Sequence, residues 1–143
     1  MPVKVLIPTK IMKKILIGGH EQSFKNDLRT LLELDGFQMQ EASKPGEALK
    51  KVLEEKFDVI VLHLQLDLDN TLSTLAFSAI RMVDRELPVI VITDNAETLS
   101  SIAPVVHEAF KHFHTPVDPK EIVGAIKEAI NVKFDSQQTS LKG

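Results

Sequence analysis

Residues 58–66 read DVIVLHLQL, and this stretch decides the fold class. Its centre, VIVL at 59–62, is an unbroken apolar run in which three of the four side chains are β-branched. Such a run is typical of a strand that is buried on both faces of a parallel sheet. An imidazole is poorly suited to the middle of a strand buried in this way, so we expect His63 to lie where the strand ends.

Four further short runs alternate with segments of helical spacing. The runs are KILI at 14–17, FQMQ at 37–40, PVIVI at 88–92 and a weaker KHFH at 111–114. The segments 23–34, 44–55, 71–84 and 118–131 place apolar residues three and four positions apart, as amphipathic helices do. This alternation predicts an α/β protein with a parallel sheet covered on both faces, and functional residues beyond the carboxyl ends of the strands.

Local signals mark the ends of these helices. Asp35-Gly36 stops the first, Pro45 suits the first turn of the second, and Asp118 begins a capping box before the last. The expected buried faces are Phe24, Leu28, Leu31 and Leu32; Ala48, Leu49, Val52 and Leu53; Leu72, Leu75, Ala76, Ala79, Ile80 and Val83; and Ile122, Ala125, Ile126, Ala129 and Ile130. In 95–107, Pro104 should shorten a helix and leave Val105 and Val106 in an irregular segment.

Composition excludes several classes of function. The chain has 143 residues, 43% of them hydrophobic, a net charge of −3 and no cysteine. The charge gives no basis for nucleic-acid binding, and the lack of cysteine excludes disulfides and thiolate metal sites. No apolar run approaches the roughly 20 residues of a membrane span, so we expect no membrane association and a cytoplasmic location. We expect one domain over 12–132, an N-terminal extension over 1–11, and a polar tail over 133–143 that is disordered from 135.

The order and spacing of the pieces resemble the response-regulator receiver domain, the phosphoacceptor of two-component signalling, over residues 13–131. The matching pieces are KILI (14–17), LELDGF (32–37), ASKPGEAL (42–49), DVIVL (58–62), PVIVIT (88–93) and TPVDPKEI (115–122). Thr93 lies 30 residues after His63 and Thr115 lies 22 after Thr93, which suits the phosphoacceptor, hydroxyl and lysine positions of the family. The resemblance implies a flavodoxin-like, doubly wound sheet of strand order 2-1-3-4-5 and a cis peptide bond between Thr115 and Pro116.

The same resemblance implies that the family's chemistry has been lost. The acidic pair that holds Mg²⁺ falls on Gly19 and His20, the phosphoacceptor aspartate on His63, the lysine on Thr115 and the switch aromatic on His112, while the hydroxyl is retained as Thr93. Mg²⁺ prefers oxygen ligands, and phosphoryl transfer depends on a metal and a cation to neutralise charge. We therefore expect a degenerate receiver that is not an enzyme and has no metal or other cofactor.

Other interpretations stay open. The histidine-rich strand edge could bind a transition metal or a small ligand, although its spacing matches no known motif: His20, His63, His112 and His114, with Asp67 and Asp94 close in sequence. The chain could be a genuine phosphoreceiver that uses Asp67 or Asp69 in place of the lost aspartate. Gly18-Gly19 lacks the rest of any phosphate-binding motif, so nucleotide binding would rest on fold analogy.

The interpretation that fits best is a stand-alone signalling domain that contacts a protein partner without being phosphorylated. We expect the contact on the last helix–strand–helix region, over 95–107, 111–114 and 118–131, and a monomer or weak dimer. His63 then marks the place of the lost nucleophile.

Overall fold

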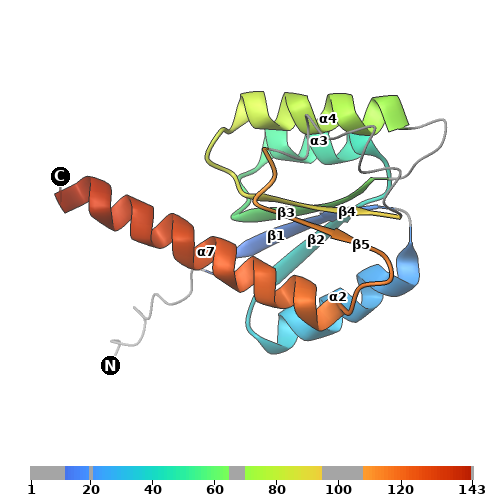
Figure 1. The fold of residues 1–143 in the computed structure, drawn as a ribbon, viewed down its shortest axis with the longest axis horizontal. Helices are drawn as coiled ribbons and strands as arrows, with labels where there is room; N and C mark the ends of the chain where they lie inside the picture. Colours follow the sequence, from blue (N-terminus) through green and yellow to red (C-terminus); the bar gives the residue numbers. More distant parts are fainter. Residues whose placement is uncertain (1–11, 20, 65–69, 95–107, 143) are drawn as a thin grey trace.

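Five parallel strands form one sheet at the centre of the molecule (Figure 1). The computed structural model describes residues 12–19, 21–64, 70–94 and 108–142. The strands are β1 (Lys14–Gly18), β2 (Gln38–Ala42), β3 (Val59–Leu64), β4 (Val89–Thr93) and β5 (Lys111–His114). Their order is β2-β1-β3-β4-β5, and all neighbouring pairs are parallel. The predicted fold class and strand order are confirmed.

Helices cover both faces of the sheet. Those described are α2 (Gln22–Leu34), α3 (Pro45–Glu54), α4 (Asn70–Val83) and α7 (Pro119–Lys142). In Figure 1, α3 and α4 lie on one face, and α2 and α7 lie on the other. Because parallel strands are joined by helical crossovers, both faces must be apolar, and this is why the strands are near-continuous valine, isoleucine and leucine runs.

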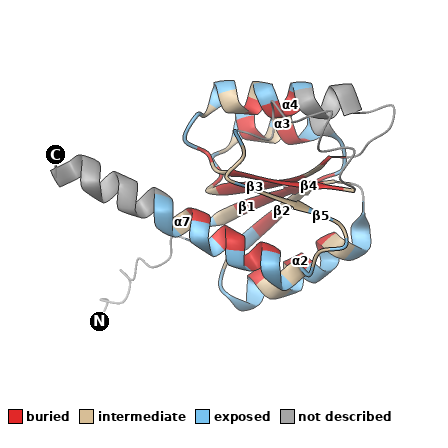
Figure 2. Cartoon of the chain, in the orientation of Figure 1, coloured by how far each residue is buried: buried red, intermediate tan, exposed pale blue. Residues whose placement is uncertain are grey.

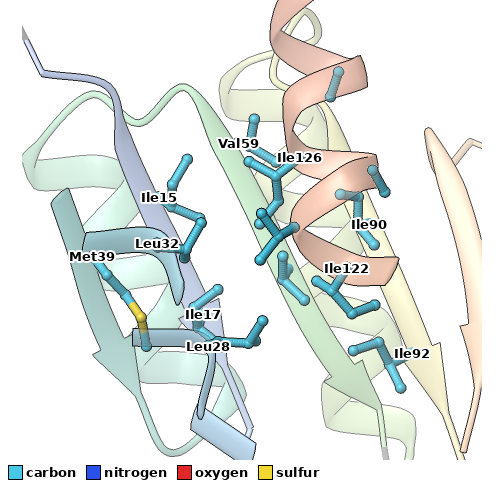
Figure 3. Packing of buried hydrophobic residues seen from close by; sticks show 14 residues of the cluster. Ile15, Ile17, Leu28, Leu32, Met39, Val59, Ile90, Ile92, Ile122 and Ile126 are labelled. Carbon is cyan, nitrogen blue, oxygen red and sulfur yellow. The ribbon is translucent and has the colours of Figure 1, made fainter. Parts of the chain in front are cut away.

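The alternation of side chains along each strand divides the core in two. Val59 and Val61 of β3 pack with α2 and α7, whereas Ile60, Leu62 and Leu64 pack with α3 and α4. Figure 3 shows the first cluster, in which Leu28 and Leu32 of α2 and Ile122 and Ile126 of α7 meet the sheet. Because side chains alternate along a strand, His63 lies on the same face of the sheet as Val59 and Val61, the face covered by α2 and α7.

The predicted helix ends are confirmed where the structure describes them. α2 ends at Leu34, and Gly36 then adopts a φ of +85°, which favours glycine. Pro45 is the first residue of α3. Asp118 caps α7, because its Oδ1 accepts a hydrogen bond of 2.9 Å from the backbone N–H of Lys120.

The predicted buried faces of α3 and α4 are partly wrong. α4 buries Phe77 together with Ala76 and Ile80, whereas Leu75 and Val83 are exposed. The buried stripe is therefore rotated toward Phe77, a residue that the expected face omits. On α3, Ala48 and Val52 meet the core, and Leu53, one position further round the helix, points away from it and is exposed. Figure 2 shows exposed segments along the outer sides of these helices.

The prediction of a disordered tail from residue 135 is also wrong, because α7 continues to Lys142 and extends beyond the sheet (Figure 1). The segment 132–142 contains no glycine or proline, so nothing interrupts the backbone hydrogen bonding once the helix is formed. Residues 1–11 and the segment 95–107, with Pro104, Val105 and Val106, lie outside the described residues. None of the described helices is both long and apolar enough to span a membrane.

We expect Phe77→Ala to lower the free energy of unfolding by about 3–5 kcal/mol, because it removes a ring that is 1% exposed and leaves a cavity between α4 and the sheet. Met82→Ala on the same helix is the control: Met82 is 80% exposed, so the change should stay within about 0.5 kcal/mol. Urea denaturation of both variants measures the difference. Equal losses in the two variants would contradict the assigned helix face.

Candidate functional site

The carboxyl ends of the strands meet at one edge of the sheet and bring together most of the predicted site residues. His63 is the penultimate residue of β3, Thr93 is the last of β4, and Asp94 follows it. Thr93 stands beside Leu64 on one side and His114 on the other. Gly19 and Thr115 follow β1 and β5 at the same edge.

His63 is bonded to Asp94. The imidazole Nε2 lies 2.7 Å from Asp94 Oδ1, and the His63 side chain is 9% exposed while that of Asp94 is 37% exposed. A buried polar ring needs a hydrogen-bond partner, and a carboxylate supplies a strong one. The histidine therefore lies at the strand end, as predicted, and its ring nitrogen is engaged within the protein.

Thr115 fixes the backbone on which Asp94 stands. Its N–H donates to the carbonyl of Thr93 at 2.8 Å, and its Oγ1 donates to the carbonyl of Asp94 at 3.0 Å. The Thr115–Pro116 peptide bond is cis, as predicted. At the position where the resemblance implies a lysine, this chain thus has a hydroxyl that bonds to the neighbouring main chain.

Thr93 makes a second histidine contact on the other face of the sheet. Its side chain is fully buried, and its Oγ1 lies 3.1 Å from His112 Nε2 and 3.5 Å from the carbonyl oxygen of Phe113. Burial, and to a smaller extent the neighbouring His114, lowers the pKa of His112. The Phe113 ring packs with the core on the α2 and α7 side, opposite Thr93, as the alternation of β5 predicts.

Two adjacent glycines, Gly18 at the end of β1 and Gly19 after it, are explained by close packing. A Cβ at Gly18 would come within 2.9 Å of Leu62 Cδ2, and a Cβ at Gly19 would come within 2.9 Å of His63 Cβ. Gly19 also has a φ of +155°, which side chains rarely adopt. The turn at Gly19 therefore fits against His63 only because position 19 has no side chain.

A buried lysine completes the turn, and the sequence analysis missed it. Lys25 of α2 is 2% exposed, and its Nζ donates to the carbonyl of Gly19 at 2.6 Å and lies 3.9 Å from Glu41 Oε1. Glu41 itself accepts a hydrogen bond of 2.7 Å from Arg29 Nη2. The spacing of Lys25, Leu28 and Leu32 places them on one helical stripe, which could have predicted that Lys25 is buried. A lysine in such a stripe is usually exposed, however, so the spacing alone did not indicate it.

A pocket of about 270 Å³ opens beside His63. It is lined by Glu21, Phe24, His63, Ile92, Thr115, Pro116 and Val117. Its floor is largely apolar, and Glu21 is the charged carboxylate among these lining residues. His20, Asp67 and Asp69 lie outside the described residues. Among those that are described, no three histidine or carboxylate side chains are grouped as a metal site would require.

Comparison with known proteins gives a consistent result. The model of the response regulator receiver domain family matches residues 15–127. The transcriptional regulatory protein CpxR homolog of Haemophilus influenzae is 29% identical over 116 residues, which are 81% of this chain and 49% of that protein. The alkaline phosphatase synthesis transcriptional regulatory protein PhoP of Bacillus subtilis is 29% identical over 115 residues, 80% of this chain and 47% of that protein. The chain thus spans about half the length of these relatives.

Solved structures share the same fold. A CheY-like receiver domain from Methanospirillum hungatei is 22% identical, with a TM-score of 0.77, over 87% of this chain and 98% of that one. A receiver domain from Clostridium thermocellum is 25% identical, with a TM-score of 0.72, over 85% and 97%. A streptococcal protein, described as one of a family of redox sensors that evolved from two-component response regulators, is 19% identical, with a TM-score of 0.77, over 89% and 55%.

We expect Gly19→Ala to destabilise the domain by about 1–3 kcal/mol, since it combines a strained backbone with a Cβ 2.9 Å from His63 Cβ. Gly124→Ala is the matched control, because Gly124 lies within α7 with nothing within 4 Å of an added Cβ. That variant should gain about 0.5–1 kcal/mol from helix propensity. Thermal or urea unfolding compares the two, and a stable Gly19→Ala protein would show that the turn can open.

We expect Glu41→Gln to destabilise the domain by at most about 1 kcal/mol near neutral pH, because the Arg29 pair is only partly buried. The hydrogen bond from Arg29 lowers the pKa of Glu41. The folded pKa is thus below the unfolded one, so the stabilisation is present above about pH 4.5 and is lost as the pH falls through the folded value. Urea unfolding between pH 7 and 3 should therefore show the wild type and variant converging in acid. Glu33→Gln, whose carboxylate is 56% exposed, should cost less at neutral pH.

Proposed function

Because the chain belongs to the response regulator receiver domain family, we propose that it acts in two-component signalling as a receiver that does not take up a phosphoryl group and signals through contact with a protein partner. The observation that carries the proposal is the hydrogen bond between His63 and Asp94 at the end of β3. At the strand end where receivers keep their aspartate, this chain has an imidazole whose Nε2 is already bonded to a carboxylate.

The donor groups do not fit Mg²⁺, which the family uses. Mg²⁺ requires near-octahedral oxygen ligands and is usually held by carboxylates. Gly19, at one of the acidic positions, has no side chain, and its Cβ position is blocked by His63. Asp94 Oδ1 is bonded to His63. In the described part of the chain, this edge therefore offers the engaged carboxylate of Asp94 and the single carboxylate of Glu21, where a magnesium site needs several convergent oxygens.

The charges near the pocket also disfavour a phosphoryl group. Transfer requires cations to neutralise the charge of the moving group. The described residues that line the pocket include the carboxylate of Glu21 and no lysine or arginine. The nearby ammonium group of Lys25 is buried and donates to the Gly19 carbonyl. A phosphoryl group here would face Glu21 and Asp94 without a cation from the pocket lining.

The proposed output is a protein contact through β5 and α7, with the preceding segment 95–107, which lies outside the described residues. Receiver domains interact with other signalling proteins, so a signalling component in the cytoplasm is the proposed partner, and the proposed state is a monomer or weak dimer. The streptococcal redox sensor is described as having evolved from response regulators, which supports the idea that this fold can serve signals other than phosphorylation.

We expect no phosphoryl adduct on the wild-type protein after incubation with acetyl phosphate and Mg²⁺, as measured by intact-mass and peptide mass spectrometry. His63→Asp alone should also remain unmodified, because the metal ligands and the lysine are still missing. Two unit charges about 4 Å apart interact by about 4 kcal/mol at an effective dielectric of about 20. Each loss of about 1.36 kcal/mol in transition-state stabilisation slows transfer tenfold.

The combined variant Gly19→Asp, His20→Asp, His63→Asp, Thr115→Lys has the best chance of reaction, using the retained Thr93. Its yield should be limited by stability, since an aspartate at 63 keeps the Cβ that a side chain at 19 would meet. Circular dichroism must show that each variant is folded before its lack of an adduct is counted. An adduct on wild-type His63, on the introduced aspartate of the single variant, or on Asp67 or Asp69 would overturn the proposal.

A further inference from the structure

The pocket beside His63 is lined by three separate parts of the chain. They are the start of α2, the ends of β3 and β4, and the turn between β5 and α7: Glu21, Phe24, His63, Ile92, Thr115, Pro116 and Val117. Its volume of about 270 Å³ lies just below the range of about 300–1,000 Å³ that is typical of sites for drug-sized molecules. A ligand that fits this pocket must therefore be small.

We propose that the pocket binds a small organic ammonium ion, with a compact hydrocarbon body on the apolar floor and the charged group at Glu21. The inference deepens the proposed function and rests on it, because it gives the domain a small ligand as its signal in place of a phosphoryl group.

The floor of the pocket favours a hydrocarbon body. Ile92 is fully buried in the core, and Phe24 and Val117 pack against the same core while remaining partly exposed. The free energy gained by removing apolar surface from water grows with the area that is covered. A compact hydrocarbon that covers Phe24 and Val117 is therefore stabilised there, whereas a ligand that is polar throughout is not.

The polar groups around the floor favour a ligand that donates hydrogen bonds. The carboxylate of Asp94 can only accept, so we assign a proton to His63 Nε2, which donates to it. The Thr115 hydroxyl donates to the Asp94 carbonyl, and Pro116 has no N–H group. These side-chain donors are already used within the protein, while the carboxylate of Glu21 only accepts. A primary ammonium group, with three N–H donors and no acceptor, matches this arrangement.

The charge at the pocket has the sign that an ammonium ion requires. Glu21 precedes α2, and its carboxylate makes no cap hydrogen bond to that helix. The positive end of the helix dipole opposes a cation, but it amounts to about half an elementary charge, against a full charge on Glu21. The nearby ammonium group of Lys25 is buried, donates to the Gly19 carbonyl and lies 3.9 Å from Glu41 Oε1. The described lining residues include no lysine or arginine, so the balance favours a cation.

A ligand in this pocket contacts two elements at once. Phe24 belongs to α2, whereas Thr115, Pro116 and Val117 lead from β5 into α7, the elements proposed to contact the partner. A ligand shifts a conformational equilibrium only through its different affinity for the two states. Because the ammonium ion touches both α2 and the turn, it favours the arrangement in which these two parts keep their present spacing.

The test is a nuclear magnetic resonance titration of the full-length, isotope-labelled protein at pH 7, with three probes that share one hydrocarbon body: cyclohexylammonium, cyclohexanol and cyclohexanecarboxylate. The amides of Phe24, Thr115 and Val117 should shift and saturate with the ammonium probe. Its dissociation constant should be about 1 mM or somewhat weaker, as expected for so small a ligand. The alcohol should bind more weakly, and the carboxylate should give no saturable shift, because it faces Glu21.

Glu21→Gln separates the contribution of charge from that of shape. It should weaken binding of the ammonium probe by about fivefold, the most that an exposed ion pair usually contributes, and leave binding of the alcohol unchanged. Asp27→Asn is the matched control, because it removes an exposed carboxylate from the same helix outside the pocket. The affinity for the ammonium probe should stay the same in that variant.

An absence of saturable shifts with the ammonium probe would overturn the inference, as would binding of the alcohol or the carboxylate that is as tight as that of the ammonium probe. These results need only the wild-type protein, so they decide even if a variant does not fold. An unchanged ammonium affinity in a folded Glu21→Gln protein would also overturn it. A phosphoryl adduct in the acetyl phosphate assay would instead overturn the proposed function, so the two failures appear in separate experiments.

Discussion

The hydrogen bond between His63 and Asp94 is the constraint on which the rest of the strand edge depends. A buried imidazole without a partner would destabilise the fold, because desolvating a polar ring is costly unless it is hydrogen-bonded. Asp94 meets that need at 2.7 Å and is itself positioned by Thr115, whose hydroxyl bonds to the Asp94 carbonyl. The ends of β3, β4 and the turn after β5 are thereby joined through one short chain of polar contacts.

The turn after β1 is adapted to the same imidazole. Gly19 approaches His63 so closely that position 19 cannot carry a side chain, and its carbonyl is held by the buried ammonium group of Lys25. Lys25 lies near Glu41, which is paired with Arg29, so α2 and β2 are tied to this turn. A site of several close carboxylates would repel itself without a bound cation, whereas here the carboxylates of Glu41 and Asp94 are paired with groups of the same chain.

The sequence predicts the sheet well and the site only in part. Strand identity and order follow from the runs at β1, β3 and β4, because a strand buried on two faces leaves few alternatives to valine, isoleucine and leucine. The orientation of α4 does not follow, since Leu75 and Phe77 are both apolar and only the packing against the sheet decides which is buried. The partner of Lys25 could not be predicted either, because a carbonyl at a glycine turn leaves no mark in the sequence. Likewise, the resemblance locates His63, Thr93 and Thr115 at one edge, but not their partners.

The pairing of these groups has a consequence for how such a domain can change state. A site that needs a metal and a phosphoryl group is completed by binding them, and its free energy changes when they arrive. Here the side chains of His63, Thr93, Asp94 and Thr115 already have hydrogen-bond partners, so a signal that acts on them must change the strength of contacts that exist. Both side-chain contacts at the end of β4 use an imidazole, one beside a carboxylate and one beside a hydroxyl. The carboxylate of Asp94 can only accept a hydrogen bond from its imidazole, whereas the hydroxyl of Thr93 can donate to its imidazole or accept from it. The two contacts therefore differ in what they require of the ring: Asp94 requires an N–H at Nε2 of His63, and Thr93 can bond to His112 with or without a proton at Nε2.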